Sequence, residues 1–297
     1  MKRAVLTSLK TDCRTNVCVK YGLHWSTVDD ILSNAVKEAL KEQDLSHVTG
    51  VFVDETQYGH GHSYITTFLD QNHKVIYICE GHGMDTLRLF RDHLVIQGGD
   101  PESIRFFSAD MSSAYESGIL SHFPNADLVW DRFHLTKAVN DAVNDIRKKL
   151  VRRDKFESLK LVKYTVLTRS GNLNPTQAER LRNIRLNNPE MATAFDMKEV
   201  FLDIIRLRDP KSMRRCLEAW IEWVESEGHD ALKRKAGRFK EKMGRIMAWT
   251  RHPVSNSVSE GVNKNIQDIR RQAYGFMDTG SFFDMILLRQ GDLTFRF

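Results

Sequence analysis

The chain has 297 residues, of which 41% are hydrophobic and 28% are charged, and these proportions are ordinary for a globular protein. No apolar run approaches the roughly 18 residues that a membrane helix needs, so we expect no membrane span. Residues 1–7 lack the apolar core of a secretory signal, and four scattered cysteines suit a reducing compartment. These features predict a cytoplasmic protein with one elaborated domain or two.

The net charge of +5 is unevenly distributed along the chain. Residues 132–251 carry 28 Lys and Arg against 16 Asp and Glu, a net charge of +12, while the remainder carries 16 against 23, a net charge of −7. Such an asymmetry predicts a polyanionic partner for the basic stretch. The alternative interpretation is a solvated helical surface without such a partner.

Residues 11–43 are predicted to be helical, with a turn at Gly22 between two helices. Ser26 is placed to cap the second helix, and Asp29 follows at the spacing of a capping box. This arrangement is typical of a helix-turn-helix, whose second helix enters the major groove of DNA. An ordinary hairpin of two packed helices has the same pattern, so both interpretations stay open.

From residue 50 to about 150, short apolar runs alternate with helical patterns. A turn at 70–73 makes the second and third strands an antiparallel hairpin. The order β-β-β-α-β-α-β-α predicts an α/β fold with a mixed five-stranded sheet and flanking helices, the order of RNase H-like folds. The predicted strands are 51–54, 62–69, 75–80, 104–109 and 126–130, and the predicted helices are 84–96 and 112–123.

Three of these strands end at an aspartate, namely Asp54, Asp110 and Asp131. A sheet gathers its strand tips in one place, so we expect these carboxylates to lie close together. Any one of them alone would be interpreted as a loop or helix-cap residue. Three in succession favour a functional cluster.

The C-terminal part contains one helix pattern with an unusual polar face. Val258, Val262, Ile266 and Ile269 form its apolar face, and the other face carries Asn256, Glu260, Asn263, Gln267 and Arg271. Solvated faces are usually rich in Lys and Glu, so this stripe predicts a functional surface. Glu260 by itself has a second interpretation, as the capping-box partner of Ser257. Before this helix, residues 170–250 are predicted to be helical, with Asn174, Asn188 and Asp209 capping helices that begin at prolines.

Together these motifs resemble those of DDE-type insertion-sequence transposases, most closely the ISL-three-like family, which has an RNase H-like catalytic core. The resemblance extends from about residue 14 to 290. The motifs that carry it are Val53-Asp54-Glu55, Ser108-Ala109-Asp110-Met111-Ser112-Ser113-Ala114-Tyr115, Phe123-Pro124-Asn125-Ala126, Asp131-Arg132-Phe133-His134, and Ser255-Asn256 followed by Glu260-Gly261-Val262-Asn263.

The resemblance implies that Asp54, Asp110 and Glu260 are the catalytic carboxylates and the metal ligands. Three carboxylates repel one another unless cations neutralise them, and hard oxygen ligands select Mg²⁺ or Mn²⁺. Two such ions, about 3.5–4 Å apart, suit in-line phosphoryl transfer. The expected reaction is hydrolysis of a DNA strand at a transposon end, followed by strand transfer. Supporting roles are expected for Asp131, His134, Asn256 and Asn263.

The resemblance also implies the domain organisation and the partners. We expect a helix-turn-helix-like segment at 1–48, a catalytic core at 49–135 and 252–297, and a basic helical insertion at 136–251. The expected partners are transposon ends and target DNA, bound by a homodimer associated with the nucleoid. Candidate contacts to DNA are Arg132, Arg147, Lys148, Lys149, Arg152, Arg153, Lys264, Arg270 and Arg271.

The sequence departs from the family pattern in one respect, and two alternative functions stay open. Full-length relatives carry a cysteine-rich zinc-binding segment ahead of the helix-turn-helix, and the printed sequence has none. A fragment, a truncated copy or a host-adopted descendant would explain this, and so would a non-catalytic DNA-binding protein derived from a transposase. The other alternative is a structure-specific nuclease of RNase H-like fold, which would use the same carboxylates without strand transfer.

Overall fold

The structure, a computed structural model, describes residues 1–58, 63–154, 159–254, 257–272 and 278–296, without the side chains of Asp154, Ser257 and Glu260. The chain forms two compact units, which we call unit 1 (Met1–Leu128 with Ser255–Phe297) and unit 2 (Val129–Val254). Among the described residues, none of the helices combines the length and the apolar character that a bilayer crossing requires.

Unit 1 contains a mixed sheet and the helices around it. Its elements are α1 (Lys2–Leu9), α2 (Arg14–Tyr21), α3 (Trp25–Lys41), β1 (Gly50–Gln57), β2 (Tyr64–Asp70), β3 (Val75–Glu80), α4 (Met84–Ile96), η1 (Pro101–Ser103), β4 (Phe106–Ala109), α5 (Ser113–His122), α13 (Ser257–Gln272) and α14 (Thr279–Gln290), while β5 (Asp127–Trp130) continues into unit 2.

The five strands lie in the order β3-β2-β1-β4-β5. β1 pairs with β2 and β2 with β3 in antiparallel fashion, while β1 and β4 are parallel, with Gly50 opposite Phe106 and Phe52 opposite Ser108. Gly50 allows this close pairing, because a Cβ atom there would lie 2.2 Å from the Phe106 ring. The predicted α/β class and mixed five-stranded sheet are therefore confirmed, as are the predicted hairpin and the helices at α4 and α5.

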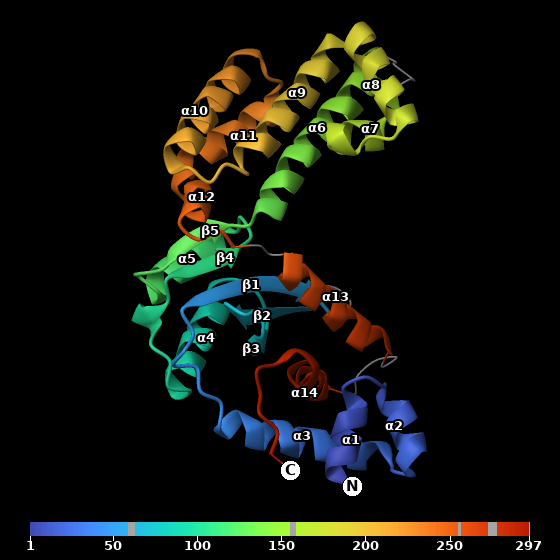
Figure 1. Ribbon diagram of the computed structural model, residues 1–297, viewed down its shortest axis with the longest axis vertical. Helices are drawn as coiled ribbons and strands as arrows, with labels where there is room; N and C mark the ends of the chain where they lie inside the picture. The colour runs from blue at the N-terminus through green and yellow to red at the C-terminus, as the bar shows by residue number, and fades with distance from the viewer. Residues whose placement is uncertain (59–62, 155–158, 255–256, 273–277, 297) are drawn as a thin grey trace. The chain divides into compact units, whose positions relative to one another are not determined.

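The two faces of the sheet are covered by different helices. On one face, Phe68 of β2 stacks on Phe90 of α4 at 4.4 Å between ring centroids, and Phe107 of β4 lies 4.6 Å from Phe123, just after α5. Full burial of such a ring contributes roughly 1.5–3 kcal/mol to folding. The other face carries α13 and α14, and Figure 1 shows α13 running alongside β1. The interior of unit 1 thus lies on both sides of the sheet.

The N-terminal helices differ in detail from the prediction. Gly22 ends α2 in the left-handed conformation, with φ of 64°. The N-cap of α3 is His24, whose ring nitrogen accepts from the backbone N–H of Ser26, so the prediction of Ser26 as the cap is wrong. Asp29 does not complete a capping box. It forms an ion pair with Arg14 of α2 at 2.5 Å, which ties the two helices together.

After β5 ends at Trp130, the described residues of unit 2 form helices joined by turns and loops, with no further strand among them, as predicted. Asn174, Asn188 and Asp209 accept backbone N–H groups at the starts of three helices, each with a proline in its first turn, so these cap predictions are confirmed. The elements are α6 (Arg132–Asp154), α7 (Lys163–Leu167), η3 (Ser170–Asn172), α8 (Pro175–Asn187), α9 (Pro189–Ile204), α10 (Pro210–Glu227), α11 (Asp230–Glu241), α12 (Met243–Met247) and η4 (Ala248–Thr250).

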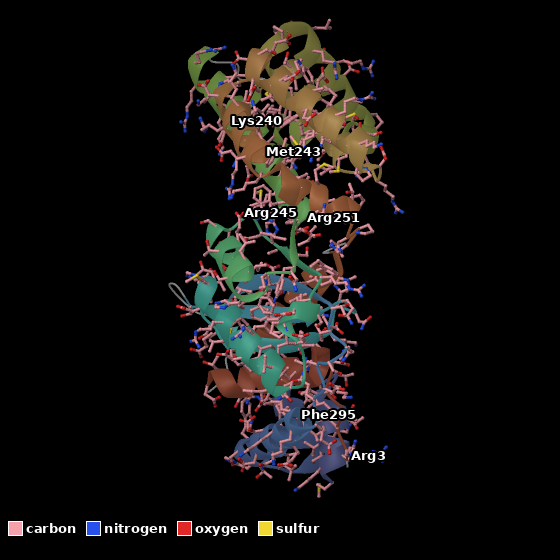
Figure 2. The ribbon with its side chains drawn as sticks, turned by 90° about the vertical axis from the view of Figure 1, so that its left-hand side faces the viewer. Arg3, Lys240, Met243, Arg245, Arg251 and Phe295 are labelled. Carbon is pink, nitrogen blue, oxygen red and sulfur yellow. The ribbon has the colours of Figure 1, made fainter. Side chains whose placement is uncertain are left out.

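Aromatic side chains hold the helices of unit 2 together. Phe201 of α9 lies 4.8 Å from Trp220 of α10 and stacks on Phe239 of α11 at 5.0 Å. The Trp220 indole donates to the carbonyl of Met197 at 2.7 Å, so its polar atom is satisfied inside the core. Among the basic side chains labelled in Figure 2, Lys240 is exposed and Arg245 is half-buried.

Candidate active site

Asp54 lies in the middle of β1, on the sheet face that α13 covers. Its Oδ1 accepts from the backbone N–H of Glu55 at 2.8 Å, and its Oδ2 accepts from the Asn263 side chain at 2.5 Å. Its carbonyl accepts from the Thr67 hydroxyl on β2 at 3.3 Å. These bonds restrain both the backbone and the carboxylate of a half-buried aspartate.

Asp110 follows directly on β4, the parallel neighbour of β1. The parallel register pairs Phe52 with Ser108, and β4 ends at Ala109, one residue before Asp110. Asp110 Oδ1 accepts from the backbone N–H of Ser112 at 2.8 Å, which turns the chain into α5. The parallel pairing of β1 with β4 supports the prediction that the two carboxylates lie close together, and their approach remains a prediction.

Glu55 projects from the opposite face and has a different environment. The hydroxyl of Tyr115, a side chain with only 1% exposure, hydrogen-bonds to Glu55 and lies 3.3 Å from the Thr66 hydroxyl. Burial, and then the charge of Glu55, raise the pKa of Tyr115, so the phenol stays protonated and donates to the carboxylate. Sequence reasoning missed this role of Tyr115, because no local pattern joins it to β1.

Three side chains attach α13 to the sheet at successive turns. Ser259 lies 3.3 Å from the ring nitrogen of His73, Asn263 donates to Asp54, and Gln267 donates to the carbonyl of Gln57 at 3.1 Å. Asn263 and Gln267 of the predicted polar stripe thus contact β1, and Figure 1 shows α13 running beside that strand.

Glu260 belongs to α13, three residues before Asn263, and therefore about 4.5 Å earlier along the helix axis. Residues three apart share a face, so the backbone of Glu260 is on the side that faces β1. Its side chain is outside the part of the chain that the structure describes, and so is the whole of Asn256. The placement of the Glu260 carboxylate remains a prediction.

Asp131 and His134 form a close pair at the start of α6 in unit 2. Asp131 is 6% exposed, and its two oxygens accept from the Phe133 backbone N–H at 3.0 Å and meet the His134 ring nitrogen at 2.9 Å. These contacts stabilise the beginning of a helix. The predicted support of a metal site by this pair remains a prediction.

Two of the predicted DNA contacts are engaged inside unit 2. Arg147 is 9% exposed and donates to Asn144 and to the carbonyl of Leu159. Arg132 lies over the Trp249 ring at 4.2 Å and is partly buried. The pattern of charges in the sequence does not show whether an arginine side chain is buried or exposed. We therefore remove Arg132 and Arg147 from the candidate contacts to DNA phosphates.

Other basic residues of that set are exposed. Lys149, Arg152 and Arg153 line a surface cavity of about 420 Å³ with His229, and Arg153 pairs with Glu190 at 2.8 Å. Lys148 pairs with Asp145 on the surface. In unit 1, Lys264 is exposed, Arg270 is half-buried, and Arg271 pairs with Asp268 on α13.

The residues around Asp54 suit a divalent cation. They offer carboxylate and amide oxygens, the ligands that Mg²⁺ and Mn²⁺ prefer. The Oδ1 atom of Asn263 is buried and has no hydrogen-bond partner among the described residues. A buried acceptor in this condition is unfavourable, and a cation beside it would satisfy it. The donor set therefore fits the metal that the sequence predicts.

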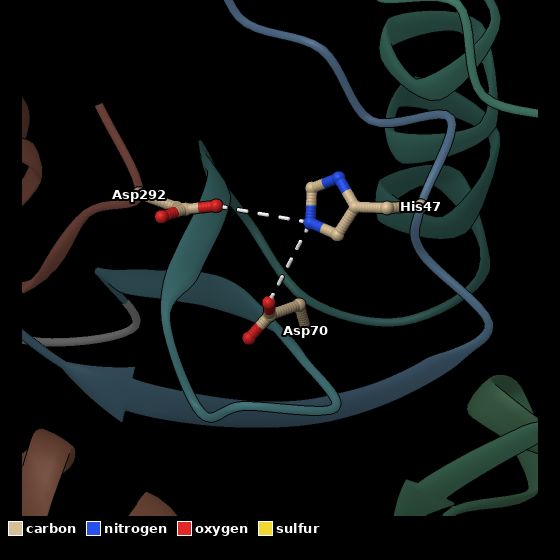
Figure 3. A group of neighbouring side chains, drawn as sticks. All are labelled: His47, Asp70 and Asp292. Carbon is tan, nitrogen blue, oxygen red and sulfur yellow. Dashed lines mark ion pairs between the residues drawn. The ribbon is translucent and has the colours of Figure 1, made fainter. Parts of the chain in front are cut away.

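His47, Asp70 and Asp292 form a separate group in unit 1. The His47 Nε2 atom lies 3.9 Å from Asp70 and 3.7 Å from Asp292 (Figure 3). Asp70 is fully buried, and its Oδ1 accepts from the backbone N–H groups of Asn72 and Lys74, which closes the turn between β2 and β3. Asp70 therefore has a structural function in the hairpin, and we assign this group no part in the reaction.

Comparison with known proteins identifies the family of the chain. A family model described as a transposase, that of the ISL3 group, matches residues 51–286. The transposase for insertion sequence element IS1001 of Bordetella parapertussis is 30% identical over 270 residues, which are 89% of this chain. The chain spans 66% of the length of that relative. Because the family model covers β1, β4 and α13 within one match, the chain belongs to the ISL3 family of DDE transposases.

Proposed function

We propose that this protein is a DNA transposase that cuts the ends of a mobile element and joins them to target DNA. The observation that carries the proposal is the hydrogen bond by which Asn263 attaches α13 to Asp54 on one face of the mixed sheet. Asp54 lies on β1, and Asp110 directly follows β4, the parallel neighbour of β1. We infer that Asp110 extends toward Asp54. We assign Glu260, on the same face of α13, as the third carboxylate.

Asp54, Asp110 and Glu260 would together hold the Mg²⁺ or Mn²⁺ ions that this chemistry uses. Bound ions of this kind acidify an attacking water or hydroxyl and stabilise a leaving oxygen. The protein would hold the DNA so that the attacking oxygen, the phosphorus and the leaving 3′-oxygen are in line. No protein side chain needs to form a covalent bond with the substrate.

The reaction has two balanced steps. In the first, a water oxygen bonds to phosphorus, the bond to the 3′-oxygen breaks, and the water gives up one proton as the 3′-hydroxyl forms. In the second, that 3′-hydroxyl attacks a phosphodiester of the target strand and releases the target's own 3′-hydroxyl. One phosphodiester is made for each one broken, so strand transfer needs no added energy source.

Binding of DNA would rely on the basic surface of unit 2 and on the N-terminal helices. The cavity lined by Lys149, Arg152 and Arg153 suits a backbone phosphate, because its lining is cationic and exposed. We assign α2 and α3 as a helix-turn-helix, with α3 as the helix that enters the major groove. Two DNA ends must be joined, so we propose a homodimer on DNA, in the cytoplasm at the nucleoid.

The test is cleavage of labelled terminal-repeat DNA in Mn²⁺ by the wild type, Asp54→Ala and Glu260→Ala. We expect metal-dependent nicks and strand-transfer products from the wild type alone. Nicks without strand transfer would instead identify a structure-specific nuclease. DNA binding without cleavage in all three proteins would identify a non-catalytic descendant.

A further inference from the structure

Asn263 is the residue of α13 that touches a proposed metal ligand directly. Its Nδ2 donates to Asp54 Oδ2 at 2.5 Å, while its Oδ1 is buried and unpartnered among the described residues. An ionised carboxylate only accepts hydrogen bonds, so the amide must present its NH₂ group to Asp54. That orientation leaves the oxygen as the atom without a partner.

The two other attachments of α13 have ordinary structural partners. Gln267 donates to a backbone carbonyl, that of Gln57, and Ser259 meets the His73 ring. The His73 ring in turn stacks on Phe52 at 4.2 Å between centroids. Docking of the helix therefore does not depend on Asn263 alone, and docking does not explain its buried oxygen.

The Asn263 side chain is uncharged, which suits a position beside a cation site. A lysine here would compete with a cation for Asp54, and an aspartate would add to the repulsion between Asp54 and Asp110. A neutral amide can restrain the carboxylate in the absence of metal and still present an oxygen to a bound ion. Because the Asn263 side chain is short, its hydrogen bond restrains the orientation of the Asp54 carboxylate.

We propose that Asn263 is a positioning residue of the cation site, whose NH₂ group orients Asp54 and whose Oδ1 is a further neutral oxygen ligand for the Mg²⁺ or Mn²⁺ that Asp54 binds. The inference rests on the proposed function, because it concerns the same ions. It assigns to α13 a second contribution, one helical turn after Glu260. The outer partners of metal ligands commonly change metal affinity by about 10- to 100-fold when removed.

The test is titration of the 297-residue chain with Mn²⁺ in the absence of DNA, with free Mn²⁺ measured by electron paramagnetic resonance. We expect Asn263→Ala to weaken Mn²⁺ binding by about 10- to 100-fold. Gln267→Ala is the matched control, because it removes an attachment of α13 without touching Asp54, and it should bind Mn²⁺ as the wild type does. Circular dichroism would verify that each variant is folded.

Asn263→Asp separates the two functions of the residue. It returns an oxygen but removes the NH₂ donor, so we expect tighter Mn²⁺ binding than in Asn263→Ala and a lower melting temperature without metal. Equal weakening of Mn²⁺ binding in Asn263→Ala and Gln267→Ala would mean that Asn263 only docks the helix, and would overturn the inference.

Asp54→Ala distinguishes failure of the inference from failure of the proposed function. Wild-type Mn²⁺ binding that is lost in Asp54→Ala but unchanged in Asn263→Ala would refute the inference and leave the proposed function standing. Wild-type protein that binds no Mn²⁺ through Asp54 would refute both.

Discussion

The amide of Asn263 meets the carboxylate of Asp54 across 209 positions of the sequence, with Nδ2 and Oδ2 separated by 2.5 Å. Between these residues the chain forms the whole of unit 2 and then returns as α13. The two halves of the proposed active site therefore come from separate stretches of the chain. Substitutions on β1 and on α13 test different halves.

Asp54 and Glu55 are adjacent, but we expect their substitutions to have different effects. Asp54→Asn keeps the shape of the side chain and removes its charge, so we expect DNA cleavage in Mn²⁺ to fall by about 10³-fold or more. Glu55 faces Tyr115 on the other side of the sheet, and Glu55→Gln should retain most of the activity. Rates of plasmid nicking at saturating Mn²⁺ provide the measurement. Equal losses in the two variants would contradict the assignment of Asp54.

His93 should make stability depend on pH. Burial lowers its pKa to about 4, and its ring stacks on Tyr77 at 4.5 Å between centroids. The ordinary pKa is about 6.5, so the unfolded chain binds more protons between pH 6.5 and 4, and stability falls as the pH falls through this window. The full effect is about 3 kcal/mol. Urea unfolding of the wild type and His93→Gln at several pH values would measure the free energy of unfolding. The same dependence of that free energy on pH in both proteins would contradict the prediction.

The ion pair between Arg14 and Asp29 should stabilise the N-terminal helices. Arg14 is 2% exposed, so Asp29→Ala leaves a buried guanidinium without its carboxylate and should cost about 3 kcal/mol or more. The double variant Arg14→Met/Asp29→Leu removes both charges and should recover part of that loss. Thermal unfolding of the three proteins is the measurement. A double variant less stable than Asp29→Ala would argue against burial as the cause.

The exposed basic residues near the end of α6 should govern the salt dependence of DNA binding. We expect Lys149→Gln and Arg152→Gln each to reduce the slope of log K against log salt by about 1, since each removes one phosphate contact. Arg147→Gln is the matched control, because Arg147 is buried and should affect stability and leave the slope unchanged. Fluorescence anisotropy with labelled DNA at several salt concentrations would measure the slopes.

Local patterns in the sequence were sufficient to predict many of the strands and helices. The apolar runs that end at Asp54 and Asp110 marked β1 and β4, because strands buried on both faces need uninterrupted apolar residues. The pairs Asn188-Pro189 and Asp209-Pro210 marked helix starts, because an oxygen acceptor and a fixed φ are both favourable there.

Contacts distant in sequence could not be predicted in the same way. The polar stripe of α13 was visible from its period, but the partner of Asn263 depends on tertiary packing against β1. The inward orientation of Arg147 depends likewise on the segment around Leu159, whose carbonyl accepts its hydrogen bond. At the start of α3, His24 caps the helix in place of Ser26, because the helix begins at Trp25 and Ser26 already lies in its first turn, where its own backbone N–H donates to the His24 ring.

The order of the two halves along the chain has a consequence during synthesis. The ribosome releases β1 and β4, and with them Asp54 and Asp110, before any part of unit 2, and α13 follows only after unit 2. At translation speeds of about 5–20 residues per second, this delay is on the order of ten seconds. A nascent chain that ends within unit 2 therefore carries two of the carboxylates without the helix that bears Glu260 and Asn263, so the proposed DNA-cutting centre forms only on a chain whose synthesis has passed α13.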